Sequence, residues 1–389
     1  MKLFEIGTGY TPIPATMGAA TEIVVEELTK AFQNDGKNVV LLDIQTDQRK
    51  TNELPIIEVP VPKLFTSTDV QLGFLHKLKR VVYSIALAGK LKNLLKEEQE
   101  EVILHFHNQY NLYFFLKLAG RELRKKAKIA YTVHSYIWPG EWDEIKDTVK
   151  KKYFQEIYCV KNADYVFVLN DKTARHFVEH LEVKKENIYK ISNGVNTEIY
   201  SRMTQKETDD FKEKLGIPGR KMIFQAGSVC DRKNQLGAVQ MLSEYMKEHK
   251  NVVYMYAGGI IDRGYKEEID DFAREKGIED QVLYVGELAP GSQLNEYYNG
   301  AHVTLFPSKV ESFGLVIIES IAAGTPVLLK EKPLFHLEDG YSVYEDEEDF
   351  IKQVDAFLKA EKDGRIREEV LRKYSWNAVA RQHFDIFTR

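Results

Sequence analysis

Residues 302–330 read "HVTLFPSKVESFGLVIIESIAAGTPVLLK" and carry the clearest signal of the fold. Two apolar runs of strand length, "HVTLFPS" and "PVLLK", flank a longer apolar segment that we expect to be a buried helix starting near Gly314. Strands that alternate with helices are typical of α/β proteins with parallel sheets. This stretch therefore predicts one strand–helix–strand unit of a parallel sheet.

The same alternation continues along the chain and restarts after a turn-rich, polar linker near "NGVNTEIYSRMTQKETDD". Each half is therefore predicted to be a doubly wound, Rossmann-like parallel sheet, with a ligand at the carboxyl ends of the strands, between two domains. We expect helices at 21–36, 109–126, 171–181, 233–249 and 265–277. We expect strands at 2–8, 38–44, 101–107, 128–134 and 165–170 in the first half, and at 221–228, 251–259, 281–287, 302–308 and 326–330 in the second.

Two glutamates, Glu311 and Glu319, interrupt the apolar stretch. If the helix starts near Gly314, the N–H groups of residues 313–315 are orphan donors at its N-terminus, and Gly314 leaves room for an approaching diphosphate. Glu319 lies inside the apolar helix, where an ionised carboxylate needs hydrogen-bond donors. A pair of sugar hydroxyls would supply them, whereas a surface glutamate paired with lysine suits these neighbours poorly.

Cations and small residues mark two other strand ends. In "QAGSVCDRKNQL", Arg232 and Lys233 follow a strand and open a helix, where they could meet phosphates, although basic pairs in loops are usually solvated. The loop "GTGYTPIPATMGAATEIVVEEL", which contains Gly18, could also line a ligand, and an ordinary loop is an equal alternative. It lacks the third glycine of a dinucleotide fingerprint, which disfavours an NAD dehydrogenase.

Three histidines lie at or near strand ends in the first half. His105 and His107 of "VILHFHN" share one face of a strand, because side chains alternate with period two. The sequence places no further ligand beside them, so we predict no metal site. His134 ends the strand of "YTVHSYIWPG" in the crevice region, where a structural role is the alternative to a ligand contact.

Charge and cysteine usage set the class of protein. The net charge of −5 divides into +2 for residues 1–200 and −7 for residues 201–389. The sequence contains no basic stripe with interleaved aromatic residues, so nucleic-acid binding is not expected. Cys159 and Cys230 are expected to be free thiols in a reducing compartment. The N-terminus resembles a strand rather than a secretory signal, so we expect a cytoplasmic protein.

The basic segment Lys63–Lys96 is predicted to be a solvated helix, with docking on the anionic inner face of a cell membrane as the alternative.

These residues resemble a known family. "ESFGLVIIE", with glutamates at both ends and seven residues between them, is similar to the signature of retaining GT-B glycosyltransferases, in particular glycosyltransferase family 4 (glycosyl transferases group 1). Further family-like pieces occur in the expected order over nearly the whole chain: "MGAATEIVVEEL", "ILHFHN", "YTVH", "ISNGVN", "RKNQ", "YAGG", "YVGE", "LFPS", "AAGTPV" and "YSWNAVARQ".

The resemblance implies a role for each matching residue. On the donor side, Arg232 and Lys233 would neutralise the diphosphate of a UDP- or GDP-sugar, and Glu319 would hold the ribose hydroxyls. Glu311 would contact the transferred sugar, which His134 would approach from the other domain. The remaining donor-binding residues would be Gly18, Ser312, Phe313, Gly314 and Leu315, and the acceptor side would include His107 and Asn108.

The resemblance also implies the organisation and the activity. It assigns residues 1–200 to an acceptor-binding domain, 201–372 to a donor-binding domain across a deep cleft, and 373–389 to a helix that crosses back. A retaining, metal-independent transferase without a cofactor is expected, acting on a lipid-linked or envelope glycan precursor. Ser228 stands where family members often carry arginine. A non-catalytic partner subunit therefore stays open as an alternative, and so does a nucleotide-sugar epimerase, which shares the architecture and needs no second substrate.

Overall fold

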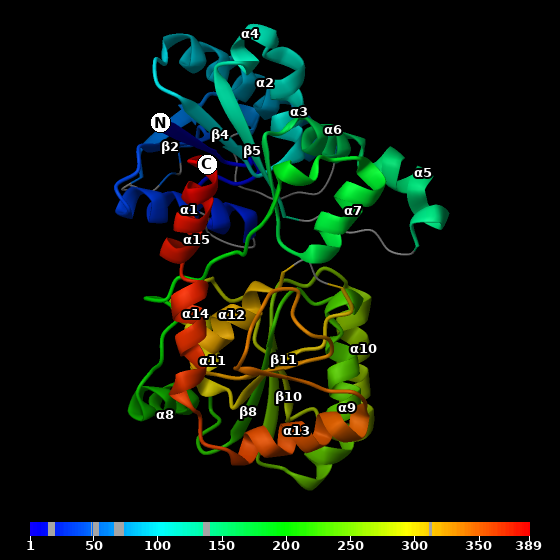
Figure 1. Cartoon of the computed structure of the whole chain (residues 1–389). Helices are drawn as coiled ribbons and strands as arrows, with labels where there is room; N and C mark the ends of the chain where they lie inside the picture. Colours follow the sequence, from blue (N-terminus) through cyan, green and yellow to red (C-terminus); the bar gives the residue numbers. More distant parts are fainter. Residues whose placement is uncertain (15–19, 48, 50–53, 66–73, 135–140, 311–312) are drawn as a thin grey trace. The chain divides into compact units, whose positions relative to one another are not determined.

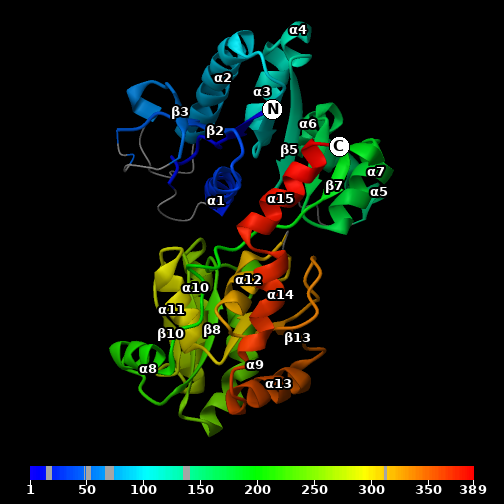
Figure 2. The ribbon, with the colours of Figure 1, turned by 60° about the vertical axis from the view of Figure 1, so that its left-hand side comes forward.

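The computed structural model describes residues 1–14, 20–47, 49, 54–65, 74–134, 141–310 and 313–389. The chain forms two compact units, one made of Met1–Asn193 with Trp376–Arg389 and the other of Gly194–Ser375. The sequence predicted divisions at 200/201 and 372/373, and the structure places them at 193/194 and 375/376. Each unit is described by itself (Figures 1 and 2).

The first unit is built on a seven-stranded, wholly parallel sheet in the order β3-β2-β1-β4-β5-β6-β7. The strand order reverses between β1 and β4, which is a switch point of the doubly wound type. The strands are β1 (Lys2–Ile6), β2 (Val39–Ile44), β3 (Ile56–Val59), β4 (Val102–Phe106), β5 (Ala127–Val133), β6 (Tyr165–Val168) and β7 (Ile188–Lys190). The helices are α1 (Ala20–Asn34), α2 (Phe74–Glu97), α3 (Gln109–Leu118), α4 (Arg121–Arg124), α5 (Trp142–Lys152), α6 (Phe154–Asn162), α7 (Asp171–Leu181) and α15 (Trp376–Phe387).

The two faces of this sheet have different coverings. Apolar side chains such as Phe4 and Phe106 pack with Tyr83 of α2 and Phe115 of α3 in the main core of the unit. The opposite face carries His105, which packs against α15. Helix α15 itself lies along α1 (Figure 1). The chain after the second unit therefore completes the first.

The second unit has a six-stranded, wholly parallel sheet in the order β10-β9-β8-β11-β12-β13, with its switch point between β8 and β11. Its strands are β8 (Lys221–Ala226), β9 (Val252–Ala257), β10 (Val282–Tyr284), β11 (Val303–Phe306), β12 (Val327–Leu329) and β13 (Tyr341–Val343). Its helices are α8 (Gln205–Lys214), α9 (Gln235–Glu248), α10 (Arg263–Lys276), α11 (Ser292–Gly300), α12 (Leu315–Ala322), α13 (Glu347–Lys359) and α14 (Glu368–Lys373).

Side-chain caps and glycines set several helix boundaries. Asn108 caps α3, and Thr204 with Glu207 forms a capping box at α8. The prediction of one helix over 109–126 is wrong, because Gly120 (φ 76°) separates α3 from α4. A helix starting at Lys233 is also wrong, because Asn234 adopts a left-handed conformation and α9 begins at Gln235.

The basic segment predicted at Lys63–Lys96 is largely helix α2, although residues 66–73 lie outside the described residues. Lys79 is buried, and its Nζ donates to the carbonyl of Tyr10 at 3.0 Å. The exposed positions include Lys77, Leu78 and Ile85. Part of the positive charge of the segment therefore faces the interior of the unit. Within the described parts of the chain, no helix is long and apolar enough to cross a bilayer. Both cysteines, Cys159 and Cys230, are free thiols, as predicted.

Candidate active site

In the second unit, the loops that follow the two switch-point strands are tied together. The 3-10 turn Asp231–Lys233 follows β8, and residues 307–310 follow β11. The amide of Lys309 donates to the carbonyl of Arg232 at 2.9 Å, and Arg232 Nη1 donates to the carbonyl of Val310 at 3.1 Å. Lys309 Nζ lies 2.6 Å from a carboxylate oxygen of Asp231. The predicted phosphate cations and the predicted donor loop thus form one surface of this unit.

Lys233 is held against the end of β8. A Cβ atom on Gly227 would lie 3.2 Å from Cε of Lys233, so a side chain at position 227 would displace the lysine. The Nζ atom lies 5.4 Å from the ring centroid of Phe306 at the end of β11, within the range of a cation–π contact. Gln225 Nε2 donates to the carbonyl of Lys233 at 2.8 Å. These contacts fix the ammonium group at the switch point.

Helix α12 begins after a glycine that no other residue would replace without strain. Gly314 has φ 90°, and a Cβ there would lie 3.0 Å from both Phe306 and Ile317. The ring of Phe313 is buried and stacks on Phe335 at a centroid distance of 4.4 Å. The amide of Ile317 donates to the carbonyl of Gly314 at 3.0 Å, so the N–H groups left for a ligand at the start of α12 are those of Leu315 and Val316. This N-terminus is therefore suited to bind an anion.

Glu319 already has hydrogen-bond donors in the protein. The hydroxyl of Tyr298, on α11, donates to Glu319 Oε2 at 3.0 Å, and Tyr200 is a second partner. Burial raises the pKa of Glu319 to about 7, because it outweighs the opposite effect of the two tyrosine hydroxyls. The sequence predicted sugar hydroxyls as donors and did not find these tyrosines. The ribose contact of Glu319 stays a prediction.

Three of the predicted site residues, Gly18, Glu311 and Ser312, lie outside the described residues. Ser228, in the position where the resemblance implies arginine, lies in the loop after β8, and its carbonyl accepts from Gln235 Nε2 at 3.0 Å. Arg232 and Lys233 are the cations that this loop offers.

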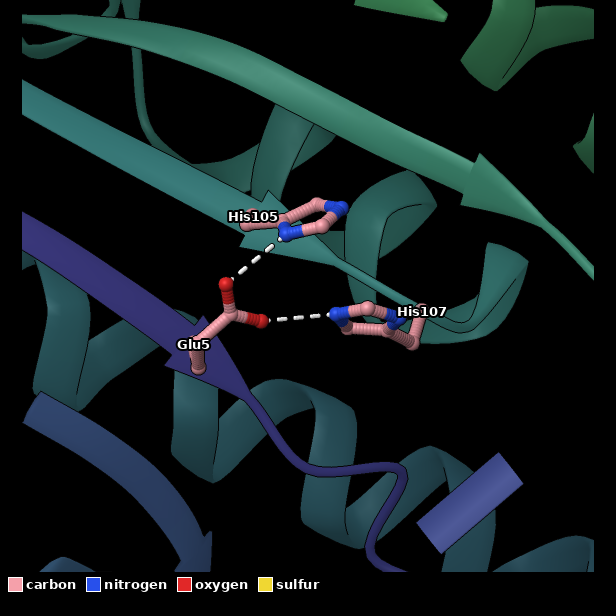
Figure 3. Close-up of side chains that lie close together, drawn as sticks. All are labelled: Glu5, His105 and His107. Atoms are coloured by element: carbon pink, nitrogen blue, oxygen red, sulfur yellow. Dashed lines mark hydrogen bonds and ion pairs between the residues drawn. The ribbon is translucent and has the colours of Figure 1, made fainter. Parts of the chain in front are cut away.

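The first unit brings three histidines and one carboxylate into a continuous network, and Figure 3 shows its members Glu5, His105 and His107. Glu5 on β1 is directly opposite His105 on β4, because the two strands are paired in parallel register. Glu5 Oε1 lies 2.9 Å from His105 Nδ1, and Glu5 Oε2 lies 2.7 Å from His107 Nε2. His105 Nε2 lies 2.7 Å from Thr132 Oγ1, and His107 Nδ1 lies 3.0 Å from His134 Nε2. The network therefore runs from the interior of β4 to His134 at the end of β5.

The ionisation of Glu5 fixes the proton positions. Burial acts to raise the pKa of Glu5, but the interactions with His105 and His107 outweigh it and lower the pKa to about 2. An ionised carboxylate only accepts, so His107 Nε2–H donates to it. Burial lowers the pKa of His107 to about 4 and that of His134 well below its ordinary value, so both rings are neutral at pH 7. Nδ1 of His107 then accepts from Nε2–H of His134, and Nδ1 of His134 keeps its lone pair.

Sequence reasoning missed Glu5, although a signal was present. A glutamate in the middle of the apolar run "KLFEI" needs partners if the strand is central. The ligand atoms of Glu5, His105 and His107 lie within 4.8 Å of one another, so these residues could hold a metal ion. Both nitrogens of each imidazole already have a hydrogen-bond partner, however, so the network is complete as a set of hydrogen bonds. Metal independence stays a prediction.

The two predicted acceptor-side residues line one cavity with His134. This cavity of about 230 Å³ is bordered by His107, Asn108, His134, Tyr10, Arg80 and Glu156, among others. Asn108 Nδ2 donates to the hydroxyl of Tyr10 at 2.6 Å, while its oxygen caps α3. The carboxyl of Glu156 accepts from the hydroxyl of Tyr131 at 2.8 Å, and burial raises its pKa to about 7. Arg80 and Glu156 were not predicted as site residues.

Comparison with known protein families shows to which family the chain belongs. Residues 21–199 match the family described as Glycosyltransferase Family 4, and residues 207–374 match the family described as Glycosyl transferases group 1. The chain belongs to this family of glycosyltransferases. The family resemblance predicted from the "ESFGLVIIE" stretch is thereby confirmed.

Two curated relatives illustrate the similarity of this glycosyltransferase to characterised proteins. It is 28% identical over 190 residues to the D-inositol 3-phosphate glycosyltransferase of Corynebacterium aurimucosum, which covers 48% of this chain and 45% of that protein. It is 23% identical over 342 residues to the alpha-monoglucosyldiacylglycerol synthase of Streptococcus pneumoniae, covering 83% of this chain and 70% of that protein. The chain thus spans about half the length of the first curated relatives it matches.

Solved structures confirm the fold of this glycosyltransferase. Anabaena HepE, crystallised with UDP, is 13% identical, with a TM-score of 0.71 and coverage of 100% of both chains. A glycosyltransferase from Rickettsia africae is 15% identical, with a TM-score of 0.71 and coverage of 100% of this chain and 97% of that one. The predicted GT-B architecture, with two Rossmann-like parallel-sheet domains, is confirmed.

Proposed function

We propose that this glycosyltransferase moves a sugar from a UDP- or GDP-sugar to a hydroxyl acceptor, with retention of the anomeric configuration. The observation that carries the proposal is the link between the loops after β8 and β11 in the second unit. That link gathers Arg232, Lys233 and the N-terminus of α12 at one switch point. Two cations and a helix N-terminus together form a site suited to a diphosphate.

In this proposal the second unit binds the donor and stabilises the leaving group. As the glycosidic bond breaks, negative charge grows on the nucleoside diphosphate, and the sugar acquires oxocarbenium-like positive charge. Lys233 is fixed before the reaction by Gly227 and Phe306, so its charge requires little rearrangement during the step. The acceptor hydroxyl attacks from the face that the diphosphate leaves, and its proton passes to the departing phosphate. In this proposal Glu311 orients the transferred sugar, and Glu319 accepts from the ribose.

In this proposal the first unit binds the acceptor and contributes the neutral imidazole of His134. His134 is held by His107, and His107 by the ionised Glu5, so the tautomer of His134 with an unprotonated Nδ1 is favoured. In this role His134 accepts a hydrogen bond from a sugar hydroxyl. Glu5 touches no substrate in this scheme and acts as a positioning residue.

The proposed acceptor is a lipid-linked, glycolipid or envelope glycan precursor. The name of the streptococcal relative, a glucosyldiacylglycerol synthase, supports a lipid acceptor. The exposed side of α2, with Lys77, Leu78 and Ile85, would dock on an anionic membrane surface. Flotation with anionic liposomes tests the docking, and binding should be strong at low salt and weak at high salt. Failure to bind at low salt would contradict it.

A radiolabelled donor screen tests the activity. Wild type should transfer sugar from one UDP- or GDP-sugar to a lipid or glycan acceptor. Lys233→Ala and Glu311→Ala should each reduce transfer at least tenfold, by loss of charge stabilisation and of sugar orientation. Lys206→Ala, which removes an exposed lysine on α8, is the matched control and should keep full activity. Undiminished transfer in both site variants would contradict the assignment.

The same screen separates the two alternatives. An epimerase would convert the donor without an acceptor, so product analysis in the absence of acceptor identifies it. A partner subunit impaired by Ser228 would bind no sugar nucleotide in calorimetry. Measurable donor affinity together with acceptor-dependent transfer would exclude both.

A further inference from the structure

The cavity in the first unit contains a positive charge that its own walls do not balance. Arg80 on α2 lines the cavity beside His134, Asn108, Tyr110 and Glu156. Its Nε atom is buried and has no hydrogen-bond partner, and within the described residues no carboxylate pairs with the guanidinium. Arg80 as a whole is half-buried, but a buried N–H donor without an acceptor is energetically costly. Such a group therefore points to a ligand that supplies the acceptor.

Aromatic rings hold this arginine in place of acidic side chains. The Cζ atom lies 4.3 Å from the ring centroid of Tyr10 and 5.3 Å from that of Tyr110. Burial raises the pKa of Tyr10 to about 12, so its phenol is neutral and does not cancel the charge of Arg80. The hydroxyl of Tyr10 is fixed in turn by Asn108 Nδ2 at 2.6 Å. Contacts with the faces of aromatic rings position a guanidinium and leave its N–H groups able to bind an anion.

The nearby carboxyl groups form no ion pair with Arg80 within the described residues. Burial raises the pKa of Glu156 to about 7, and its carboxyl accepts a hydrogen bond from the hydroxyl of Tyr131. Burial also raises the pKa of Glu22, which accepts a hydrogen bond from Thr8. Lys79 does not line the cavity: its Nζ donates to the carbonyl of Tyr10, and it interacts electrostatically with Asp43 and Glu22. The cavity wall thus places the Arg80 guanidinium beside hydrogen-bonding groups, and within the described residues neither Glu156 nor Glu22 forms an ion pair with it.

We propose that the acceptor carries a phosphate group and that Arg80 binds it. The inference rests on the proposed function, because it names the class of molecule whose hydroxyl is glycosylated. A guanidinium offers a planar pair of N–H donors that matches phosphate oxygens. Because Arg80 and His134 line the same cavity, an acceptor anchored by its phosphate would hold a neighbouring hydroxyl beside the transferred sugar that His134 contacts in the proposed function.

The size of the cavity limits the ligand to a compact group. Its volume of about 230 Å³ lies below the roughly 300–1,000 Å³ usual for sites of drug-sized molecules. A polyol phosphate or a phosphorylated lipid headgroup fits this range, with any acyl chains left outside. Both sources share the same chemistry at Arg80, so the experiment has one arm for each.

The test compares Arg80→Met, Arg80→Lys and the exposed control Arg121→Met in the full chain. Glycerol 3-phosphate is titrated by calorimetry in one arm, and vesicles containing phosphatidic acid are used in the other, at high salt, where docking of α2 on an anionic surface is weak. Wild type and Arg121→Met should bind in at least one arm. Arg80→Met should lose about tenfold to hundredfold in affinity, the loss expected when a charge-assisted hydrogen bond is removed. Arg80→Lys should recover part of it. Binding of glycerol 3-phosphate identifies a soluble acceptor, and binding of vesicles alone identifies a lipid headgroup.

Nucleotide binding makes the two proposals separable. UDP and GDP affinities should be the same in wild type and Arg80→Met, because Arg232 and Lys233, the residues proposed to bind the diphosphate, belong to the second unit. Circular dichroism and Arg80→Lys exclude a folding defect. Equal binding of the phosphate probe by wild type and Arg80→Met would overturn the inference, as would wild type that binds a nucleotide and neither phosphate probe. Absence of any nucleotide binding, with Arg80-dependent phosphate binding intact, would instead contradict the proposed function.

Discussion

His107 Nδ1 lies 3.0 Å from His134 Nε2, and the two imidazole rings are stacked with an interplanar angle of 27°. One ring belongs to the end of β4 and the other to the end of β5, so the hydrogen bond joins neighbouring strand ends at the carboxyl edge of the sheet. Because His107 is held by Glu5, a carboxylate in the interior sets the orientation of a histidine at the cavity wall.

Glu5→Gln should destabilise the protein at neutral pH. The folded pKa of Glu5 is about 2 against an ordinary 4.5, so its ionisation contributes about 3 kcal/mol of stability above pH 4.5. This contribution is lost as the pH falls through the folded pKa. Urea unfolding at pH 7 and pH 3 should show a difference from wild type that shrinks at the lower pH. Glu101→Gln, at an exposed position, should cause no change. A difference that does not depend on pH would contradict the ionised state of Glu5.

Glu319 should make nucleotide binding depend on pH. Its pKa in the ligand-free protein is about 7, and the ionised form is the better acceptor for ribose hydroxyls. The affinity for UDP-glucose or GDP-mannose should rise about tenfold from pH 6 to pH 8, because the ionised fraction rises by that factor. Calorimetry on Glu319→Gln should give a flat profile, and Glu331→Gln should behave like wild type. A flat wild-type profile would argue against the ribose contact.

Gly314→Ala should weaken donor binding more than it weakens the fold. The new Cβ would be strained at φ 90° and would crowd Phe306 and Ile317, at a cost of about 1–3 kcal/mol. Gly277→Ala is the matched control, since Gly277 also has a positive φ (67°) but open space around its Cβ position. Both variants should lose stability in thermal unfolding, whereas only Gly314→Ala should lose UDP or GDP affinity. Equal affinities in the two variants would show that the start of α12 does not contact the donor.

Glu156→Gln should stabilise the protein in alkaline solution. Burial raises the folded pKa of Glu156 to about 7, so the unfolded chain gives up its proton at a lower pH than the folded one. Wild-type stability should therefore fall by up to about 3 kcal/mol between pH 4.5 and pH 8 through this group. The glutamine variant should lack that fall, and the exposed Glu144→Gln should retain it. Parallel pH profiles for wild type and Glu156→Gln would contradict the assigned burial effect.

Transfer should not require a metal ion. Each imidazole nitrogen of His105 and His107 has a hydrogen-bond partner that an ion would have to replace. Activity should be unchanged after dialysis against EDTA, and elemental analysis should find no stoichiometric zinc. Recovery of lost activity by added zinc would identify Glu5, His105 and His107 as a metal centre instead.

The sequence predicted the central strands well because they are long and apolar. It missed β3, β7 and β13, which are edge-region strands of three or four residues with weak apolar patterns. The break at Gly120 was also missed, because one glycine in a helical pattern does not by itself reveal a positive φ. The alternation of central strands with helices was thus predictable, whereas the edge strands, helices such as α5, α6, α11 and α13, and the local boundaries were not.

The positions of some candidate site residues were predictable from strand ends, while their roles stay predictions. Arg232, Lys233 and Gly314 lie in the segments that follow β8 and β11, so the sequence alone placed them at one sheet edge. Glu5 and Arg80 required the fold. The partner of Glu5 depends on the register of β1 with β4. Arg80 lines the cavity because of the orientation in which helix α2 packs in the first unit. Neither relationship can be read from neighbouring residues in the chain.

Helix α15 gives the first unit a particular order of assembly. His105, the partner of Glu5, packs against His383 and Phe387 of α15, which is synthesised after the entire second unit. A growing chain can complete the second sheet while the charged face of the first is still uncovered. Truncation before Trp376 would leave this face open to water, so the ionised carboxylate would lose its buried setting. Domain-by-domain folding from the N-terminus, common in larger proteins, is therefore not available to this chain in its simple form.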